Sequence, residues 1–480
     1  MNSSISQIVR KSSRLILCGV ACLGVGCHSR HAVNSGYGVA WITLTAEPGN
    51  FTGYIARINS VTFTRSDGQV FTALATVEPV DFVKLGAVSE LYGTATIPIG
   101  TYTAATVTLD YTSASIAVPI NGVPQIAKVV GPTNAAVTTV PVVVTFDKAN
   151  PLVIAPTPTT SSAVRVALDL NLAASNVVNL ATNPATVTVN PFITASVLSP
   201  DQKLIRVRGP LTNSSVPVGT YSIQIRPFYD EVDSLGSLTL FNDANTLYTL
   251  NGTNYVGSAG LTALSQTSAG TTMTAAYTTF VPTSNTNANP AYPAGKFNTQ
   301  YVVAGSTLED FYTQGIEGDV IARSGNTLKL RGAILSLNSS GSFSYLVNDA
   351  AVTVGASTIV TADGNSHLSG LSSNSIGVGQ HIEVRGLYSL PSPTTPTVDA
   401  TGATSTNTGS VRLEPTALYG SVVSAGAGSV AMNLQSIGPW PASIFDFTGN
   451  GATAAQKPVA SNFLVNPGTL AVPPKMARSA

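Results

Sequence analysis

The sequence predicts an all-β fold: a prealbumin-like or immunoglobulin-like sandwich followed by two or three small β-barrel modules. Apolar and polar residues alternate in short segments such as residues 39–45 (VAWITLT), 60–64 (SVTFT) and 166–172 (VALDLNL). Gly, Pro, Asn and Asp separate these segments, and short strands with frequent turns are typical of sandwiches and barrels. Helical periodicity is scarce, and the best candidate helices are residues 83–92 and 260–267.

The composition agrees with this fold class. Charged residues make up 10% of the 480-residue chain and hydrophobic residues 44%, whereas ordinary soluble domains contain about 25% charged residues. Low charge combined with high apolar content is not the signature of disorder, and it fits strands with one apolar and one hydroxyl-bearing face. The formal net charge is +0 and the basic residues are scattered, so we expect no nucleic-acid partner.

The N-terminus has the features of an export signal. All three cysteines, Cys18, Cys22 and Cys27, lie within the first 27 residues. Basic residues precede the apolar run 15–26 (LILCGVACLGVG), and Cys27 follows this run directly. The run is shorter than the roughly 20 residues that span a bilayer as a helix, but it suits a signal peptide. We therefore expect residues 1–27 to be a signal peptide with a lipobox-like cysteine.

A cysteine in this position resembles the lipobox of bacterial lipoproteins. The resemblance implies that Cys27 is acylated, that the chain is cut before it, and that the lipid bilayer is a partner. Gly24 stands where the lipobox has Leu, and Leu23 lies one position too early. Cys22 is the alternative lipidation site, and a plain secretory signal or an uncleaved anchor stay open. Lipidation is favoured because a secreted domain held by disulfides would keep cysteines in its body.

His28 follows Cys27 at the position where retention at the inner membrane commonly uses Asp. The resemblance therefore implies an outer-membrane lipoprotein, on the periplasmic face or the cell surface. The exported body is expected to divide into modules, with Pro-, Thr- and Asn-rich linkers or exposed loops at 282–293 and 391–409. The expected modules are the sandwich at 37–175, the first barrel module at 195–305, the second at 306–390, a third and partial one at 410–470, and a tail at 471–480.

Two kinds of internal repeat occur. The segment IPIGTYT (97–103) returns as VPVGTYS (216–222), each time before an alternating strand. We expect the glycines of these turns to need a positive φ and Tyr102 and Tyr221 to be buried with their hydroxyls paired. Trp41 is expected in the core as well. Residues 318–332 and 420–434 are similar to each other, and both patterns predict a β-hairpin.

A family resemblance rests on five motifs in order: residues 44–51 (LTAEPGNF), 58–63 (INSVTF), 80–85 (VDFVKL), 98–103 (PIGTYT) and 167–170 (ALDL). They resemble an uncharacterised β-sandwich domain found near the N-terminus of many bacterial lipoproteins. Residues 376–386 (IGVGQHIEVRG) resemble the closing strand of a second uncharacterised, often repeated β-barrel module. The two resemblances cover most of the exported chain, and neither implies an activity or catalytic residues.

Histidine is rare, with only His28, His31, His367 and His381. No dense cluster of His and Cys is present, so a zinc site is not expected. No Gly-x-Ser-x-Gly elbow occurs, and nothing local supports a triad that would recruit His367 or His381. His381 lies within the strand pattern of residues 376–386, and we interpret it as a structural strand residue. The glycines of residues 426–431 (GAGSVA) precede a strand pattern and predict a hairpin turn, since a dinucleotide site needs a helix there.

The densest acidic group is Asp230, Glu231 and Asp233. Such a turn is a candidate Ca²⁺ site, because Ca²⁺ prefers oxygen ligands; the alternative, which we favour, is a solvated turn. The acidic residues at 309–310 and 363–365 are interpreted in the same way. We expect no cofactor.

The sequence favours a non-catalytic cell-envelope lipoprotein that binds a polysaccharide, an envelope protein or a matrix component. One alternative is an envelope polysaccharide hydrolase with carboxylates assembled between domains, and another is a purely structural spacer. A pocket with two facing carboxylates and aromatic residues would favour the hydrolase. A flat aromatic or acidic strip would favour binding, and neither feature would favour the spacer.

Overall fold

The computed structural model describes the body of the chain. Several predicted features lie outside the described residues: the signal peptide, Cys22, Cys27 and the candidate Ca²⁺ turn at Asp230, Glu231 and Asp233. His367, the segment 282–293, the acidic residues at 309–310 and 363–365, and the tail 471–480 lie outside them too. The described residues are 36–75, 78–156, 163–197, 203–227, 234–281, 295–305, 308, 315–337, 342–362, 370–389, 395–402, 409–426, 428–449 and 458–466.

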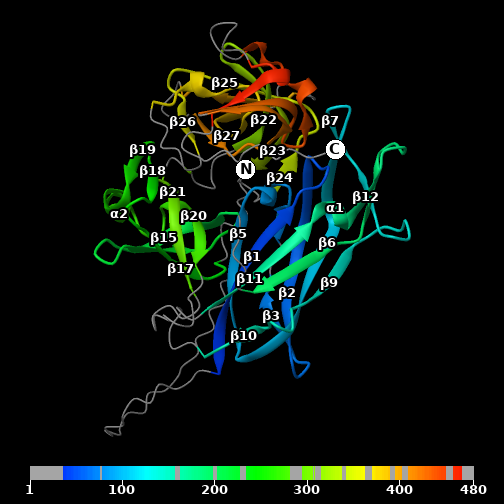
Figure 1. Cartoon of the computed structure of the whole chain (residues 1–480), viewed down its shortest axis with the longest axis vertical. Helices are drawn as coiled ribbons and strands as arrows, with labels where there is room; N and C mark the ends of the chain where they lie inside the picture. The colour runs from blue at the N-terminus through cyan, green and yellow to red at the C-terminus, as the bar shows by residue number, and fades with distance from the viewer. Residues whose placement is uncertain are drawn as a thin grey trace, which may run out of the picture.

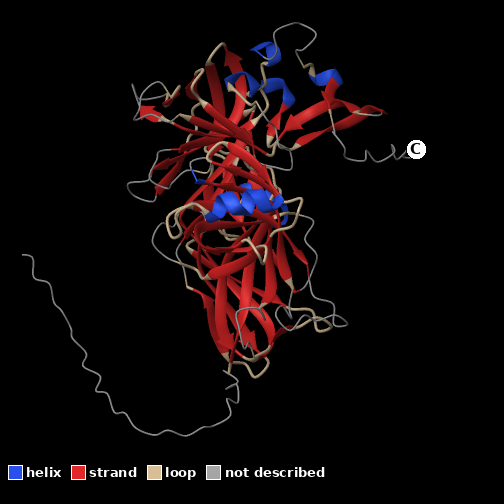
Figure 2. Ribbon diagram, turned by 90° about the vertical axis from the view of Figure 1, so that its left-hand side faces the viewer, coloured by secondary structure: helices blue, strands red, loops and turns tan. Residues whose placement is uncertain are grey.

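Nearly every regular element is a β-strand, which confirms the all-β fold class (Figure 2). Two helices are among the described elements, α1 (Leu172–Ser175) and α2 (Gly257–Ser265). The second corresponds to the helix predicted at 260–267. No helix in the described part of the chain is both long and apolar enough to cross a membrane.

The N-terminal sandwich packs two sheets face to face. In one sheet β1 (Tyr37–Glu47) pairs antiparallel with β5 (Ser89–Pro98) and parallel with β11 (Val164–Asn171). In the other, β2 (Gly53–Arg65) pairs along most of its length with β6 (Gly100–Ile120). Alternate residues of both sheets point inward and form one apolar core, as the sequence alternation predicts. The other elements are β3 (Val70–Leu74), β4 (Glu78–Asp81), β7 (Val123–Ile126), β8 (Lys128–Val130), β9 (Thr139–Thr145), β10 (Leu152–Ile154), β12 (Asn176–Asn179), β13 (Thr186–Val189) and β14 (Ile193–Val197).

The next unit, here the β15–β21 unit, continues one of these sheets. β15 (Ile205–Ser215) pairs in parallel with β5, Ile205 opposite Ser89 and Arg206 opposite Glu90. One sheet therefore runs from the sandwich into the β15–β21 unit, which lies to the left of the sandwich in Figure 1. Its other strands are β16 (Thr220–Gln224), β17 (Ser237–Phe241), β18 (Leu247–Leu250), β19 (Thr253–Val256), β20 (Met273–Val281) and β21 (Lys296–Ala304).

A third unit, here the β22–β30 sheet, lies at the top of Figure 1. β27 (His381–Arg385) pairs with β22 (Gly315–Ser324) on one side and with β30 (Ser410–Glu414) on the other. β29 (Thr397–Ala400) pairs with two strands of this sheet, so the linker prediction was wrong for those four residues. The remaining strands are β23 (Thr327–Leu337), β24 (Ser342–Tyr345), β25 (Ala350–Val354), β26 (Ile359–Ala362) and β28 (Leu387–Ser389).

The C-terminal hairpin consists of β31 (Leu418–Gly426) and β32 (Ser429–Ile437). Two short strands, β33 (Trp440–Pro441) and β34 (Phe463–Val465), also pair with β32. The hairpin shares an apolar core with the β22–β30 sheet. Both predicted hairpins, β22 with β23 and β31 with β32, are confirmed. Short 3-10 helices lie at Lys84–Gly86, Ser373–Ser375, Ala442–Ile444, Phe447–Gly449 and Ala460–Asn462.

The repeated turns also match their prediction. Gly100 and Gly219 have φ angles of +148° and +73°. Tyr102 is buried and donates its hydroxyl to the carbonyl of Pro98 at 2.7 Å. The buried Tyr221 hydroxyl lies 2.9 Å from Oγ1 of Thr299. Trp41 is buried as well.

The helix predicted at 83–92 was wrong, because only Lys84–Gly86 form a short 3-10 helix and β5 begins at Ser89. Pairing with β1, where Leu91 lies opposite Thr43, overrides the local helical pattern. The chain therefore turns sharply before β5, and this turn places Lys84 at the edge of the sandwich.

Candidate functional site

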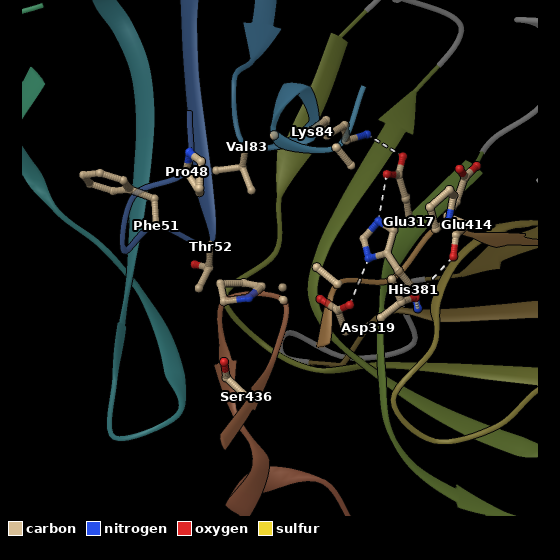
Figure 3. A pocket seen from close by; sticks show the side chains of 18 of the residues that line it. Pro48, Phe51, Thr52, Val83, Lys84, Glu317, Asp319, His381, Glu414 and Ser436 are labelled. Carbon is tan, nitrogen blue, oxygen red and sulfur yellow. Dashed lines mark hydrogen bonds and ion pairs between the residues drawn. The ribbon is translucent and has the colours of Figure 1, made fainter. Parts of the chain in front are cut away.

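A cavity of about 1220 Å³ opens where the sandwich, the β15–β21 unit, the β22–β30 sheet and the C-terminal hairpin meet. Each part contributes lining residues, among them Thr52 and Lys84 of the sandwich, Arg206 of β15, Glu317 of β22 and Ser436 of β32. Figure 3 shows the sandwich residues on one side and the strands of the β22–β30 sheet on the other. Segments far apart in sequence therefore build one site.

One wall of the cavity is a face of the β22–β30 sheet. Side chains of a strand alternate between its two faces, and here Ile316, Ile382 and Val411 point into the apolar core. Their neighbours along the strands are ionisable and line the cavity. The pairing registers place them in two rows across β22, β27 and β30: Glu317, Glu383 and Arg412 in one row, and Asp319, His381 and Glu414 in the other.

A chain of alternating charges crosses this wall. Lys84 donates from Nζ to Oε2 of Glu317. His381 lies 2.9 Å through Nε2 from Oε1 of Glu317 and 3.0 Å through Nδ1 from Oδ1 of Asp319. The buried indole of Trp440 donates to Oδ2 of Asp319 at 2.9 Å. The chain links the sandwich, the β22–β30 sheet and the C-terminal hairpin, and Figure 3 shows its members Lys84, Glu317, His381 and Asp319.

The surroundings of His381 favour its protonated form. Each ring nitrogen lies within hydrogen-bond distance of a carboxyl oxygen, and only the protonated ring can donate from both nitrogens. Burial would lower the pKa of His381, but Asp319 and then Glu317 raise it well above the usual 6.5. Burial likewise would raise the pKa of Glu317, but Lys84 and His381 hold it well below its usual value. Glu317 and His381 therefore both favour their charged forms at neutral pH.

A second set of ion pairs lies beside the first. Arg412 donates from Nε to Oε1 of Glu414 at 2.7 Å and forms an ion pair with Glu383. Arg385 also pairs with Glu383, at 2.5 Å. Burial opposes ionisation of Glu383, yet Arg412 and Arg385 lower its pKa to about 2. These carboxylates are held in fixed positions by charged hydrogen bonds.

The β15–β21 unit contributes two arginines and two tyrosines to the lining. Arg206 donates from Nε to the buried carboxylate of Glu90 at 2.6 Å. The charge of Arg208 interacts with Glu383 on the β22–β30 sheet. The rings of Tyr277 and Tyr301 stack with centroids 4.1 Å apart and an interplanar angle of 14°. This side of the cavity is thus basic where the opposite sheet is rich in carboxylates.

Asp81 is the one lining carboxyl that the sandwich supplies. Its Oδ1 accepts the backbone N–H groups of Tyr54 at 3.0 Å and Val83 at 3.2 Å. Burial raises the pKa of Asp81, although the charge of Lys84 opposes this. Asp81 is therefore more easily protonated than Glu317 and Glu383, whose pKa values are lowered by their ion pairs.

His381 stands in a strand, as predicted, but its ring lies at the cavity wall between two carboxylates. The other wall residues were missed. Their signal is charge at every second position, in residues 317–319, 381–385 and 412–414, within a chain that has only 10% charged residues. This alternation predicts a charged strand face, but the strands are far apart in sequence and their pairing is not visible in it.

The arrangement limits the chemistry. The carboxyls of Asp319 and Glu317 favour the protonated form of His381, and this form does not act as a general base. Among the described residues, no group of three or more His, Cys, Asp or Glu side chains could hold a metal ion. What the wall offers is an ordered array of donors and acceptors. No protein-family model, curated protein or solved structure matches the chain.

Proposed function

We propose that this protein is a cell-envelope lipoprotein, anchored through acylated Cys27, that binds an envelope or surface component in the cavity between its units. The observation that carries the proposal is the wall of six ionisable side chains on β22, β27 and β30, which are largely buried and line the cavity. Desolvating charges is costly. A purely structural spacer would have no need to place these groups around a cavity of about 1220 Å³.

Binding is favoured over catalysis because carboxylates of the wall already accept hydrogen bonds from other residues of the protein. A glycosidase needs one carboxyl that gives a proton and a second carboxylate free to attack the sugar or activate water. Both oxygens of Glu317 and both of Asp319 already accept hydrogen bonds within the protein. These groups are suited to holding a ligand more than to reacting with one.

A polysaccharide hydrolase is the second candidate, and one observation supports it. Asp81, whose pKa is raised, and Glu317, whose pKa is lowered, line the same cavity. Carboxyls with opposite shifts are the usual arrangement for an acid and its partner. Release of reducing ends from envelope polysaccharide, abolished by Asp81→Asn, would establish this activity in place of simple binding.

The binding proposal is tested by filling the cavity from either side in the soluble body, residues 28–480. Ala87 and Ala417 are exposed and line the cavity on the sandwich and hairpin sides. Ala87→Trp and Ala417→Trp should each weaken binding to purified envelope polysaccharide or envelope protein at least tenfold, measured by calorimetry. Ala149→Trp, at an exposed position outside the lining, is the matched control. Wild-type affinity in both cavity variants would refute the proposal.

A further inference from the structure

We infer that the cavity takes a neutral, polyhydroxylated ligand, an oligosaccharide of more than one ring. The inference rests on the proposed function, because it assigns a chemical class to the occupant of the same cavity. Four properties of the lining carry it: the balance of charges, the mixture of donors and acceptors, the volume with its apolar part, and the orientation of the wall strands.

The charges that line the cavity balance one another. Five carboxyl groups face four basic side chains and His381, whose two ring nitrogens each lie beside a carboxyl oxygen. Most are joined in direct pairs, such as Lys84 with Glu317 and Arg412 with Glu383. A charged ligand would add an uncompensated charge next to partly buried ion pairs, which is costly. A neutral ligand leaves the balance intact.

The wall also mixes donors and acceptors at short range. Across the three strands Glu317, Glu383 and Arg412 form one row, and neighbouring strands lie about 4.7–4.9 Å apart. A hydroxyl group donates one hydrogen bond and accepts up to two. Adjacent hydroxyls of a sugar can therefore bond to a carboxylate and a guanidinium of the same ion pair without breaking it.

The volume and the apolar part of the lining fit a chain of sugar rings. The cavity measures about 1220 Å³, above the roughly 300–1,000 Å³ of sites for single small molecules. Tyr419 lies at the lining with half of its surface exposed, and its ring can pack against the C–H face of a sugar. Five proline rings also line the cavity: Pro48, Pro119, Pro415, Pro439 and Pro441.

A peptide backbone also donates and accepts, but the wall does not suit it. Extended peptides add to the free edge of a sheet, where main-chain groups are unpaired. β27 at the middle of the wall is paired on both sides, with β22 and β30. The cavity therefore presents side chains of a sheet face, and this favours the sugar over the peptide.

The test uses the soluble body, residues 28–480, and isothermal titration calorimetry with defined probes. Neutral tri- to hexasaccharides of glucose and of N-acetylglucosamine are compared with an oligo-uronate, an oligo-lysine and a Gly-Ser hexapeptide. At least one neutral sugar should bind best, and Ala417→Trp should weaken its binding at least tenfold while Ala149→Trp leaves it unchanged. If no neutral sugar shows binding sensitive to Ala417→Trp at millimolar concentration, the inference is wrong.

A second variant tests the charge balance itself. Glu414→Gln keeps a carbonyl oxygen for the Nε of Arg412 but leaves one excess positive charge at the wall. Binding of the oligo-uronate should rise at least tenfold, and binding of the neutral sugar should fall only a few-fold. Glu47→Gln, in an exposed ion pair with Lys203 outside the lining, should change neither. No gain for the oligo-uronate would count against charge balance as the basis of selectivity.

The outcomes separate the two proposals. A charged probe or the peptide could bind better than every neutral sugar, with Ala87→Trp and Ala417→Trp weakening that binding. This result would overturn the ligand class and leave the binding function standing. Envelope components that bind equally well to wild type, Ala87→Trp and Ala417→Trp would overturn the function and the inference together.

Discussion

Lys84, on a short 3-10 helix of the sandwich, donates a hydrogen bond to Glu317 on β22, although 233 positions separate the two residues in the chain. Only about a fifth of each side chain is exposed, 18% for Lys84 and 19% for Glu317. The pair thus joins two units of the structure at the cavity wall, where solvent screens it little.

Lys84→Met should destabilise the protein because it leaves Glu317 with His381 as its main cationic partner. Removing one member of a buried pair typically costs 3–5 kcal/mol, and partial exposure places the expected loss at about 3 kcal/mol. Denaturant unfolding measures it. Lys329→Met is the control, since Lys329 is 53% exposed in its pair with Asp349 and should cost less than about 1 kcal/mol. Equal losses in the two variants would contradict the prediction.

The stability of the His381 cluster should depend on pH in a defined direction. The folded pKa of His381 is raised, so its contribution is complete below the ordinary 6.5 and is lost as the pH rises through the folded value. The folded pKa of Glu317 is lowered, so its contribution is complete above the ordinary 4.5 and is lost on acidification. The cluster therefore contributes most between pH 4.5 and 6.5.

His381→Gln should remove the alkaline part of this dependence. Thermal melts of wild type and variant from pH 4 to 10 should differ most between pH 4.5 and 6.5 and converge as the pH rises above that range. A constant difference across the range would show that His381 contributes through packing alone.

The tyrosines of the repeated turns should be structural anchors. Tyr102→Ala and Tyr221→Ala each truncate a buried ring and should cost about 3–5 kcal/mol. Hydrogen exchange followed by mass spectrometry should show lost protection in the sandwich for the first variant and in the β15–β21 unit for the second. Tyr102→Phe, which removes only the bond to the Pro98 carbonyl, should cost about 1 kcal/mol. A variant that keeps wild-type protection but loses its ligand would point to a binding role instead.

Cys27→Ser should release the protein from the membrane fraction, because the proposal has acylation at Cys27 as its anchor. Cell fractionation and the mass of the mature N-terminus measure the effect. Cys22→Ser is the matched control and should leave the protein in the membrane. Release by Cys22→Ser but not by Cys27→Ser would move the anchor to Cys22.

Local features were predictable from the sequence. The alternation of residues 39–45 follows the two faces of β1, and the glycines at 100 and 219 mark turns with positive φ. The candidate site was not predictable in the same way. Its wall depends on which strands pair and in what register, for example Asp319 opposite His381 and His381 opposite Glu414. No local pattern encodes contacts between strands whose paired residues lie 33 and 62 positions apart.

The pairing of β5 with β15, which continues the sheet from the sandwich into the β15–β21 unit, could not be predicted from the sequence for the same reason. In the described part of the chain the strand register makes this connection through two residue pairs, Ser89 with Ile205 and Glu90 with Arg206. Residues 83–92 even suggested a helix, because their apolar spacing fits both helix and strand. The pairing partner decides between the two, and it lies elsewhere in the chain.

The contrast between the apolar and the ionisable face of β27 also specifies the register in which this strand pairs during folding. If β27 slid by one position against its neighbours, its side chains would exchange faces. His381 and Glu383 would then enter the apolar core, and Ile382 and Val384, now fully buried, would enter the water of the cavity. Both changes are unfavourable, so the ionisable side chains of the wall disfavour pairing of β27 in a shifted register. Substitutions that make this wall apolar should therefore yield chains that misalign and aggregate, even where the folded state itself tolerates them.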